Sequence, residues 1–108
     1  MPSILYTVCA TCKDVAQRGR FLAWLAPGHL LQVRAGGATS VRVVLPDREN
    51  DSAAAVVETQ YVFPSRKASE IYLRDHAPAL RTDAQKHFPP ESGVIFARQI
   101  AEIATELE

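Results

Sequence analysis

The sequence predicts an α+β protein whose elements follow one another in the order β-α-β-β-α-β. Three observations lead to this order. Short runs of β-branched and aromatic residues indicate the strands, apolar residues at helical spacing indicate the two helical segments, and proline or glycine separates most elements. This is the order of the ferredoxin-like sandwich, in which a four-stranded antiparallel sheet carries its helices on one face. The chain of 108 residues fits one such domain over residues 1–108.

The first strand is predicted at residues 4–9, where β-branched and aromatic side chains predominate. Thr11 and Asp14 both offer side-chain oxygens that can cap the helix that follows. A Pro-Gly pair at residues 27–28 interrupts this helix, and residues 29–34 are predicted to continue it for a further turn or two.

The second and third strands are predicted at residues 39–45 and 54–63, with a polar loop over residues 46–52 between them. Ser65 follows a proline and is predicted to cap the next helix. That helix is expected to break before Pro78, because the residue that precedes a proline avoids the α region. Pro78 itself suits the first turn of a new helix.

The fourth strand is predicted at residues 93–98. The tail after it fits two structures, because its apolar residues have the spacing of a short helix while the strand can also run on to Ile100. The conformation of residues 101–108 is left open by the sequence.

Both faces of the predicted sheet carry apolar side chains. In the third strand Val57, Thr59, Tyr61 and Phe63 point one way, and Val56, Glu58, Gln60 and Val62 point the other. A sheet with one solvated face alternates more sharply, so we expect both faces to be covered. The helices of one chain cover only one face, and the predicted cover of the other is a second copy in a closed C2 dimer. Glu58 or Gln60 in that interface would need a partner or a water molecule.

Charge and composition exclude several classes of protein. Twelve Lys and Arg balance twelve Asp and Glu, so the net charge is zero and no general attraction to nucleic acid or to a membrane surface is expected. A hydrophobic share of 47% excludes a disordered chain, and no apolar run approaches the roughly 18 to 20 residues of a membrane span. Because residues 1–3 open without a basic, apolar leader, a cytoplasmic protein is expected.

Several segments resemble a known family. They are FLAWL at 21–25, HL at 29–30, TQY at 59–61, YLRDHAPALR at 72–81 and HF at 87–88. Together they resemble the bacterial family known as domain of unknown function 4286, from Leu5 to Ile100, with HAPALR at 76–81 the most specific part. The resemblance implies a ferredoxin-like domain of the dimeric α/β-barrel kind and no known activity. The chain departs from the family after Phe88, where it has PPESG in place of a glycine-rich turn.

Cys9 and Cys12 form a CxxC that is predicted at a strand-to-helix junction, where a helix N-terminus stabilises thiolate. This placement indicates a thiol redox pair. The other interpretation is two small, half-buried thiols, which the predicted fold favours because it lacks a thioredoxin-like start. A zinc site would need two more ligands, and the three histidines show no ligand spacing, so no metal and no cofactor are predicted.

His29 and His76 are the main candidates for a site in a cavity between sheet and helices. Each follows a helix that carries an aromatic residue, Trp24 before His29 and Tyr72 before His76. A neutral imidazole can act as a general base, or bind an anion or haem iron. The structural interpretation is that these histidines meet the free carbonyl groups at helix C-termini.

Tyr61 and Arg98 lie on predicted strands, where they can line a pocket or the dimer interface. Arg81 is predicted on a solvated helix face with alternating charges. Three functions stay open. The first is a homodimer that binds a small molecule in its cavity, with cofactor-independent or haem-linked chemistry as an option. The second is a non-catalytic dimerisation or partner-binding module, and the third is a thiol redox protein. The sequence does not decide whether the protein is an enzyme.

Overall fold

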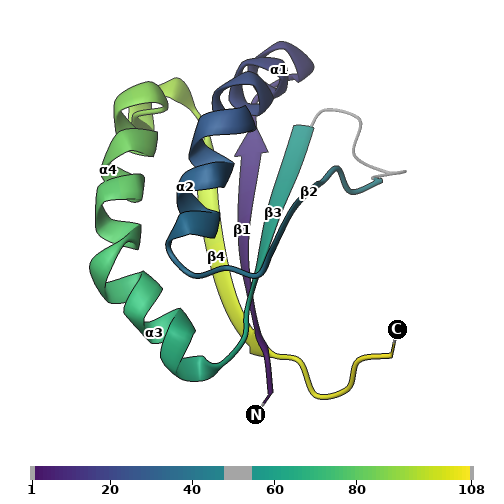
Figure 1. The fold of residues 1–108 in the computed structure, drawn as a ribbon. Helices are drawn as coiled ribbons and strands as arrows, with labels where there is room; N and C mark the ends of the chain where they lie inside the picture. Colours follow the sequence, from purple (N-terminus) through teal and green to yellow (C-terminus); the bar gives the residue numbers. More distant parts are fainter. Residues whose placement is uncertain (1, 48–54, 108) are drawn as a thin grey trace.

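The computed structural model describes residues 2–47 and 55–107, and it confirms the predicted ferredoxin-like fold (Figure 1). The strands are β1 (Ile4–Cys12), β2 (Ser40–Val44), β3 (Ala55–Phe63) and β4 (Ile95–Glu102). They form one open sheet in the order β2-β3-β1-β4, and every pair of neighbours is antiparallel. The helices are α1 (Val15–Trp24), α2 (Leu30–Ala35), α3 (Arg66–Asp75) and α4 (Ala77–His87), with short helical turns at Leu25–His29 and Pro90–Ser92. In Figure 1 the helices gather on one face of the sheet.

Local signals set the beginnings of two helices as predicted. The Asp14 carboxylate accepts a hydrogen bond of 2.7 Å from the backbone N–H of Gln17 at the start of α1. The Ser65 hydroxyl accepts one of 3.1 Å from the backbone N–H of Ala68 at the start of α3. Each bond satisfies a backbone donor that has no partner within the helix. The alternative cap, Thr11, lies inside β1.

The interruption between α1 and α2 also follows a local rule. Ala26 has φ −102° and ψ 137°, an extended conformation inside the helical turn Leu25–His29. The residue that precedes a proline is pushed out of the α region by the pyrrolidine ring, and Ala26 precedes Pro27. Chain direction then reverses at Gly37, whose φ of +120° suits a residue without a side chain.

Two strands are longer than the sequence predicts. β1 runs on from Cys9 to Cys12, and β4 runs from Ile95 to Glu102, so the tail is strand as far as Glu102, and residues 103–107 form neither strand nor helix. Pairing explains both extensions, because β1 is central and its two neighbours supply hydrogen-bond partners along its length. The predicted start of the third strand at residue 54, and residues 48–52 of the predicted loop, lie outside the described residues.

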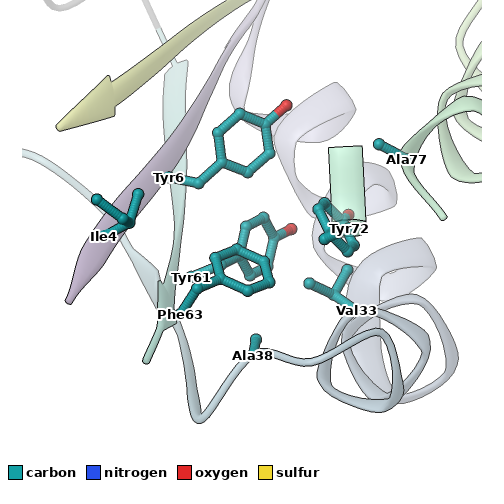
Figure 2. Packing of buried hydrophobic residues seen from close by; sticks show 8 residues of the cluster. All are labelled: Ile4, Tyr6, Val33, Ala38, Tyr61, Phe63, Tyr72 and Ala77. Atoms are coloured by element: carbon teal, nitrogen blue, oxygen red, sulfur yellow. The ribbon is translucent and has the colours of Figure 1, made fainter. Parts of the chain in front are cut away.

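The core between sheet and helices consists of two adjoining clusters. Figure 2 shows the first, which contains Ile4, Tyr6, Val33, Ala38, Tyr61, Phe63, Tyr72 and Ala77. The second contains Ala10, Cys12, Phe21, Leu25, Ala55, Val57, Phe88 and Val94. Aromatic rings pack in both clusters, for example Tyr6 against Tyr61 in the first and Phe21 against Phe88 in the second.

The other face of the sheet bears no helix and carries a polar ladder. Arg42 Nε donates a hydrogen bond of 2.6 Å to Gln60 Oε1, and Gln60 Nε2 donates one of 3.3 Å to Glu58 Oε1. These bonds supply the partners that Glu58 and Gln60 were expected to need. Around the ladder lie apolar side chains, among them Ile95, which is 68% exposed. In the described part of the chain, no helix has the length and apolar character of a membrane span.

Candidate functional site

A cleft lies between the sheet and helices α1, α3 and α4, where the two core clusters meet. The cavity volume is about 40 Å³, and the wider space of about 440 Å³ within the lining includes open solvent. Six aromatic residues line it: Tyr6, Phe21, Trp24, Tyr61, Tyr72 and Phe96. Its polar lining consists of His29, Thr59, Arg81 and Arg98. An apolar concave site with a few polar groups is the usual form of a small-molecule site in proteins.

The fold brings five of the six predicted pocket residues to this cleft. Trp24 and His29 come from the end of α1 and the turn after it, Tyr61 from β3, Tyr72 from α3 and Arg98 from β4. Residues from elements far apart in sequence therefore converge on one site.

His76 is the exception, because it does not line this cleft. Its side chain lies in a separate outer groove with Gln32 and Asp75. Its backbone N–H donates a hydrogen bond of 2.9 Å to the carbonyl of Tyr72, which ends α3. His76 therefore ends α3 through its backbone, and the contact of its imidazole with helix carbonyl groups stays a prediction. The reason is that α3 ends there and α4 begins at Ala77, which leaves the imidazole outside the core.

His29 is the group in the cleft with an unmet bonding requirement. Its ring lies 4.4 Å from the ring of Trp24, centroid to centroid, with 33° between the planes. Its Nδ1 is buried and has no hydrogen-bond partner among the described residues. Burial lowers the pKa of His29, and the charge of Asp83 opposes that shift. The imidazole is therefore neutral at pH 7, and its Nδ1 accepts or donates a hydrogen bond according to the tautomer.

Three tyrosines form the opposite part of the lining. The ring of Tyr6 lies 6.0 Å from that of Tyr61 and 6.2 Å from that of Tyr72. Figure 2 shows Tyr6 and Tyr61 projecting from the sheet toward Tyr72 on the helical layer. Burial raises the pKa of both Tyr61 and Tyr72, so their phenols stay protonated at neutral pH and serve as hydrogen-bond donors.

Arg81 and Arg98 provide the positive charge of the cleft. Both are exposed residues, so their charged ends border its open part. The guanidinium of Arg98 lies 5.7 Å from the centre of the Phe96 ring. After burial and the other tyrosines, both arginines act on Tyr72 and lower its pKa, which indicates that both charges are near this phenol. Neither arginine forms an ion pair within the described residues.

Sequence reasoning missed several lining residues. Arg81 is exposed as expected, but it also borders the cleft, because it lies on the side of α4 that carries Ala77, Leu80 and Ala84. The spacing of these four residues at i, i+3, i+4 and i+7 is the signal that identifies the face. Tyr6 pairs directly with Tyr61 across the sheet, and this register becomes visible only when the strands are paired.

The structure places the two cysteines of the CxxC at different points of one strand. Cys9 lies within β1, and Cys12 is the last residue of β1, two residues before the cap of α1 at Asp14. They are three residues apart in a strand, so they face opposite sides of the sheet and their Cα atoms are about 10 Å apart. A disulfide requires Cα atoms within about 7 Å. Both thiols are free, with Cys12 buried, where burial raises its pKa above the usual value. The pair has no redox geometry in this fold.

No cluster of three or more His, Cys, Asp or Glu side chains with the arrangement of metal ligands occurs in residues 2–47 and 55–107. The uncovered sheet face has a shallow hollow lined by Thr7, Cys9, Glu58, Ala97, Arg98 and Gln99. The cleft between sheet and helices differs from this hollow in its aromatic lining and in the unpartnered Nδ1 of His29, and it is therefore the candidate site.

Comparisons with known proteins agree on the fold. No family model and no curated protein matches the chain. Among solved structures, a dimeric ferredoxin-like protein from an uncultured marine organism has a TM-score of 0.69 at 13% identity, covering 99% of this chain and 100% of its own. A candidate antibiotic biosynthesis monooxygenase from Bacillus cereus has a TM-score of 0.68 at 10% identity, covering 100% of this chain and 99% of its own.

A second dimeric ferredoxin-like protein from an uncultured marine organism has a TM-score of 0.64 at 14% identity, covering 100% of this chain and 93% of its own. Such low identities show a shared ferredoxin-like fold and leave function to the site. The resemblance to domain of unknown function 4286 is tested by none of these comparisons and stays a prediction.

Proposed function

We propose that this protein is a homodimer, joined through the uncovered faces of its sheets, that binds a small molecule in the cleft between sheet and helices. The observation that carries the proposal is the buried Nδ1 of His29, which has no partner among the described residues and lies in an aromatic cleft. A buried polar atom without a partner costs free energy, and a bound molecule with a hydrogen-bonding group removes that cost.

The homodimer is supported by the sheet face that no helix covers. Half-buried Leu5 and Val62 and the exposed Ile95 lie on this face beside the polar ladder of Arg42 and Gln60. Such a mixture of apolar and hydrogen-bonded groups is typical of protein interfaces. Two structural neighbours are described as dimeric ferredoxin-like proteins, and the resemblance to domain of unknown function 4286 implies the same dimeric α/β-barrel assembly.

The compartment that we propose is the cytoplasm. Both cysteines of the chain are free, as expected for a protein in a reducing compartment. The proposal itself is limited to binding.

The test uses the single tryptophan of the chain, because Trp24 lines the cleft and its fluorescence reports occupancy. A library of small neutral, anionic and cationic ring compounds is titrated against the full-length protein. We expect saturable changes in Trp24 fluorescence with some of them. His29→Gln should weaken this binding. His87→Gln is the matched control, because His87 also packs on Trp24, at 5.7 Å between ring centroids, but does not line the cleft.

The mass of the protein in solution, from sedimentation equilibrium, decides the assembly separately. A dimer that binds no compound in the cleft would contradict the binding function and favour a pure dimerisation module. A monomer at concentrations well above those used for binding would contradict the assembly.

A further inference from the structure

We infer that the ligand of the cleft is a small aromatic anion of one ring, whose negative group lies at the open end beside Arg81 and Arg98. This inference rests on the proposed binding function and names its ligand class. Three properties of the lining support this ligand class. They are the sign of its charges, the aromatic rings of its apolar part, and the buried Nδ1 of His29, which has no hydrogen-bond partner among the described residues.

The charges of the cleft are all of one sign. Arg81 and Arg98 line it, and no Asp or Glu does so among the described residues. The chain as a whole has twelve basic and twelve acidic residues, so this local excess departs from the average. Outside the lining, the negative charge of Asp83 raises the pKa of His29 and so opposes the effect of burial. Its Oδ1 lies 3.8 Å from Nδ1 of His87. Two guanidinium groups without carboxylate partners attract an anion, and a planar carboxylate suits their geometry.

The apolar part of the cleft favours a flat ligand. Aromatic rings border it from both layers, with Tyr61 and Phe96 on the sheet and Trp24 and Tyr72 on the helices. A ring between such groups makes offset or edge contacts along most of its surface. The cavity volume of about 40 Å³ excludes a fused ring system, and a single ring enters it only as the lining side chains move apart.

One buried atom of the cleft, Nδ1 of His29, lacks a hydrogen-bond partner among the described residues. The Thr59 hydroxyl already donates to the carbonyl of Val8 at 3.3 Å, so it is occupied. Nδ1 of His29 has no partner in the described part of the chain, and burial keeps the imidazole neutral. A hydroxyl group on the ring, opposite the acidic group, would meet this atom without a buried charge.

The test compares probes of similar size on the full-length protein by Trp24 fluorescence. The probes are benzoate, 4-hydroxybenzoate, neutral benzamide, cationic benzylamine, and cyclohexanecarboxylate, which is anionic but not flat. We expect benzoate to bind about tenfold more tightly than benzamide, since two exposed guanidinium groups each contribute modestly. Benzylamine should not bind, cyclohexanecarboxylate should bind more weakly than benzoate, and 4-hydroxybenzoate should bind most tightly.

Variants identify the groups responsible. Arg81→Gln and Arg98→Gln should each weaken benzoate binding several-fold and leave benzamide binding unchanged. Arg34→Gln is the control, because Arg34 is an exposed arginine on α2 that does not line the cleft. His29→Gln should reduce the advantage of 4-hydroxybenzoate over benzoate. Raising the ionic strength should weaken benzoate binding more than benzamide binding.

Two results would overturn the inference. Equal affinities for benzoate and benzamide, unaffected by Arg81→Gln and Arg98→Gln, would show that charge does not select the ligand while the proposed binding function stands. No binding of either benzoate or 4-hydroxybenzoate would also refute the anion class. The wider ring library described above then decides the binding function by itself, so the two failures are distinguishable.

Discussion

Replacing Gly36 by alanine tests how rigidly the cleft is built. Gly36 ends α2 and is buried against α3. A Cβ atom there would lie 2.9 Å from Cδ1 of Tyr72 and 3.2 Å from Cγ of His76. Non-bonded carbon atoms prefer about 3.5–4.0 Å, so one of the two rings would have to move.

Tyr72 has little room to move. Its side chain is buried, and its ring packs 5.0 Å from that of Phe63 and 6.2 Å from that of Tyr6, centroid to centroid. The backbone of Gly36, with φ −77° and ψ 1°, is open to alanine, so the cost is steric and not conformational. Overpacking of this kind lowers the free energy of unfolding by about 1–3 kcal/mol. Alanine also reduces the conformational entropy of the unfolded chain, which raises the free energy of unfolding by about 0.4–1 kcal/mol. The expected net loss is about 1–2 kcal/mol.

The assay is thermal unfolding followed by circular dichroism at one fixed protein concentration, because association would shift Tm with concentration. For a domain of this size, a loss of 1 kcal/mol lowers Tm by about 4 °C, so Gly36→Ala should lower it by about 4–8 °C. Gly19→Ala is the matched control, because no atom lies within 4 Å of the added Cβ on the exposed side of α1. It should raise stability by up to about 1 kcal/mol through helix propensity. A Gly36→Ala protein as stable as the wild type would refute the reasoning.

Three further predictions concern single side chains. Burial lowers the pKa of His29 in the folded protein below 6.5, its value in the unfolded chain. As the pH falls below 6.5, the unfolded chain therefore takes up a proton at His29 before the folded protein does, and the stability of the folded protein decreases. Tm measured from pH 8 to pH 5 should therefore fall less steeply in His29→Gln, and an unchanged slope would contradict the role of burial. A thiol reagent should modify half-exposed Cys9 before buried Cys12. The rate of Cys9 modification should fall as the protein concentration rises, because the sheet faces then pair and cover Cys9. A rate of Cys9 modification that does not depend on protein concentration would argue against that interface. In urea unfolding, Ser65→Ala should lower the free energy of unfolding by about 1 kcal/mol and Ser65→Asp should leave it almost unchanged, because aspartate also accepts the hydrogen bond from the start of α3. Equal losses in the two variants would show that the cap is not the cause.

Much of the candidate site follows from short-range rules. Trp24 and His29 are predicted together because a helix ends between them, and Tyr61 is predicted on a strand because its neighbours alternate. His76 lies outside the cleft, and nothing local distinguishes the side of a helix end that faces the core from the side that faces solvent. Arg81 is exposed as predicted, but its place beside the cleft is decided only when α4 packs on the sheet.

The sequence by itself determined the order of the elements, the cap at Ser65 and the interruption at Pro27, and it narrowed the first cap to Thr11 or Asp14, because each depends on backbone rules that act over three or four residues. Tertiary structure decided that β1 continues through Cys12 and that β4 runs on to Glu102, because ladder hydrogen bonds come from partners more than forty residues away. It also decided that the redox reading of the two cysteines fails and that two arginines share a cleft. Such outcomes depend on which distant side chains meet, and no local pattern records that.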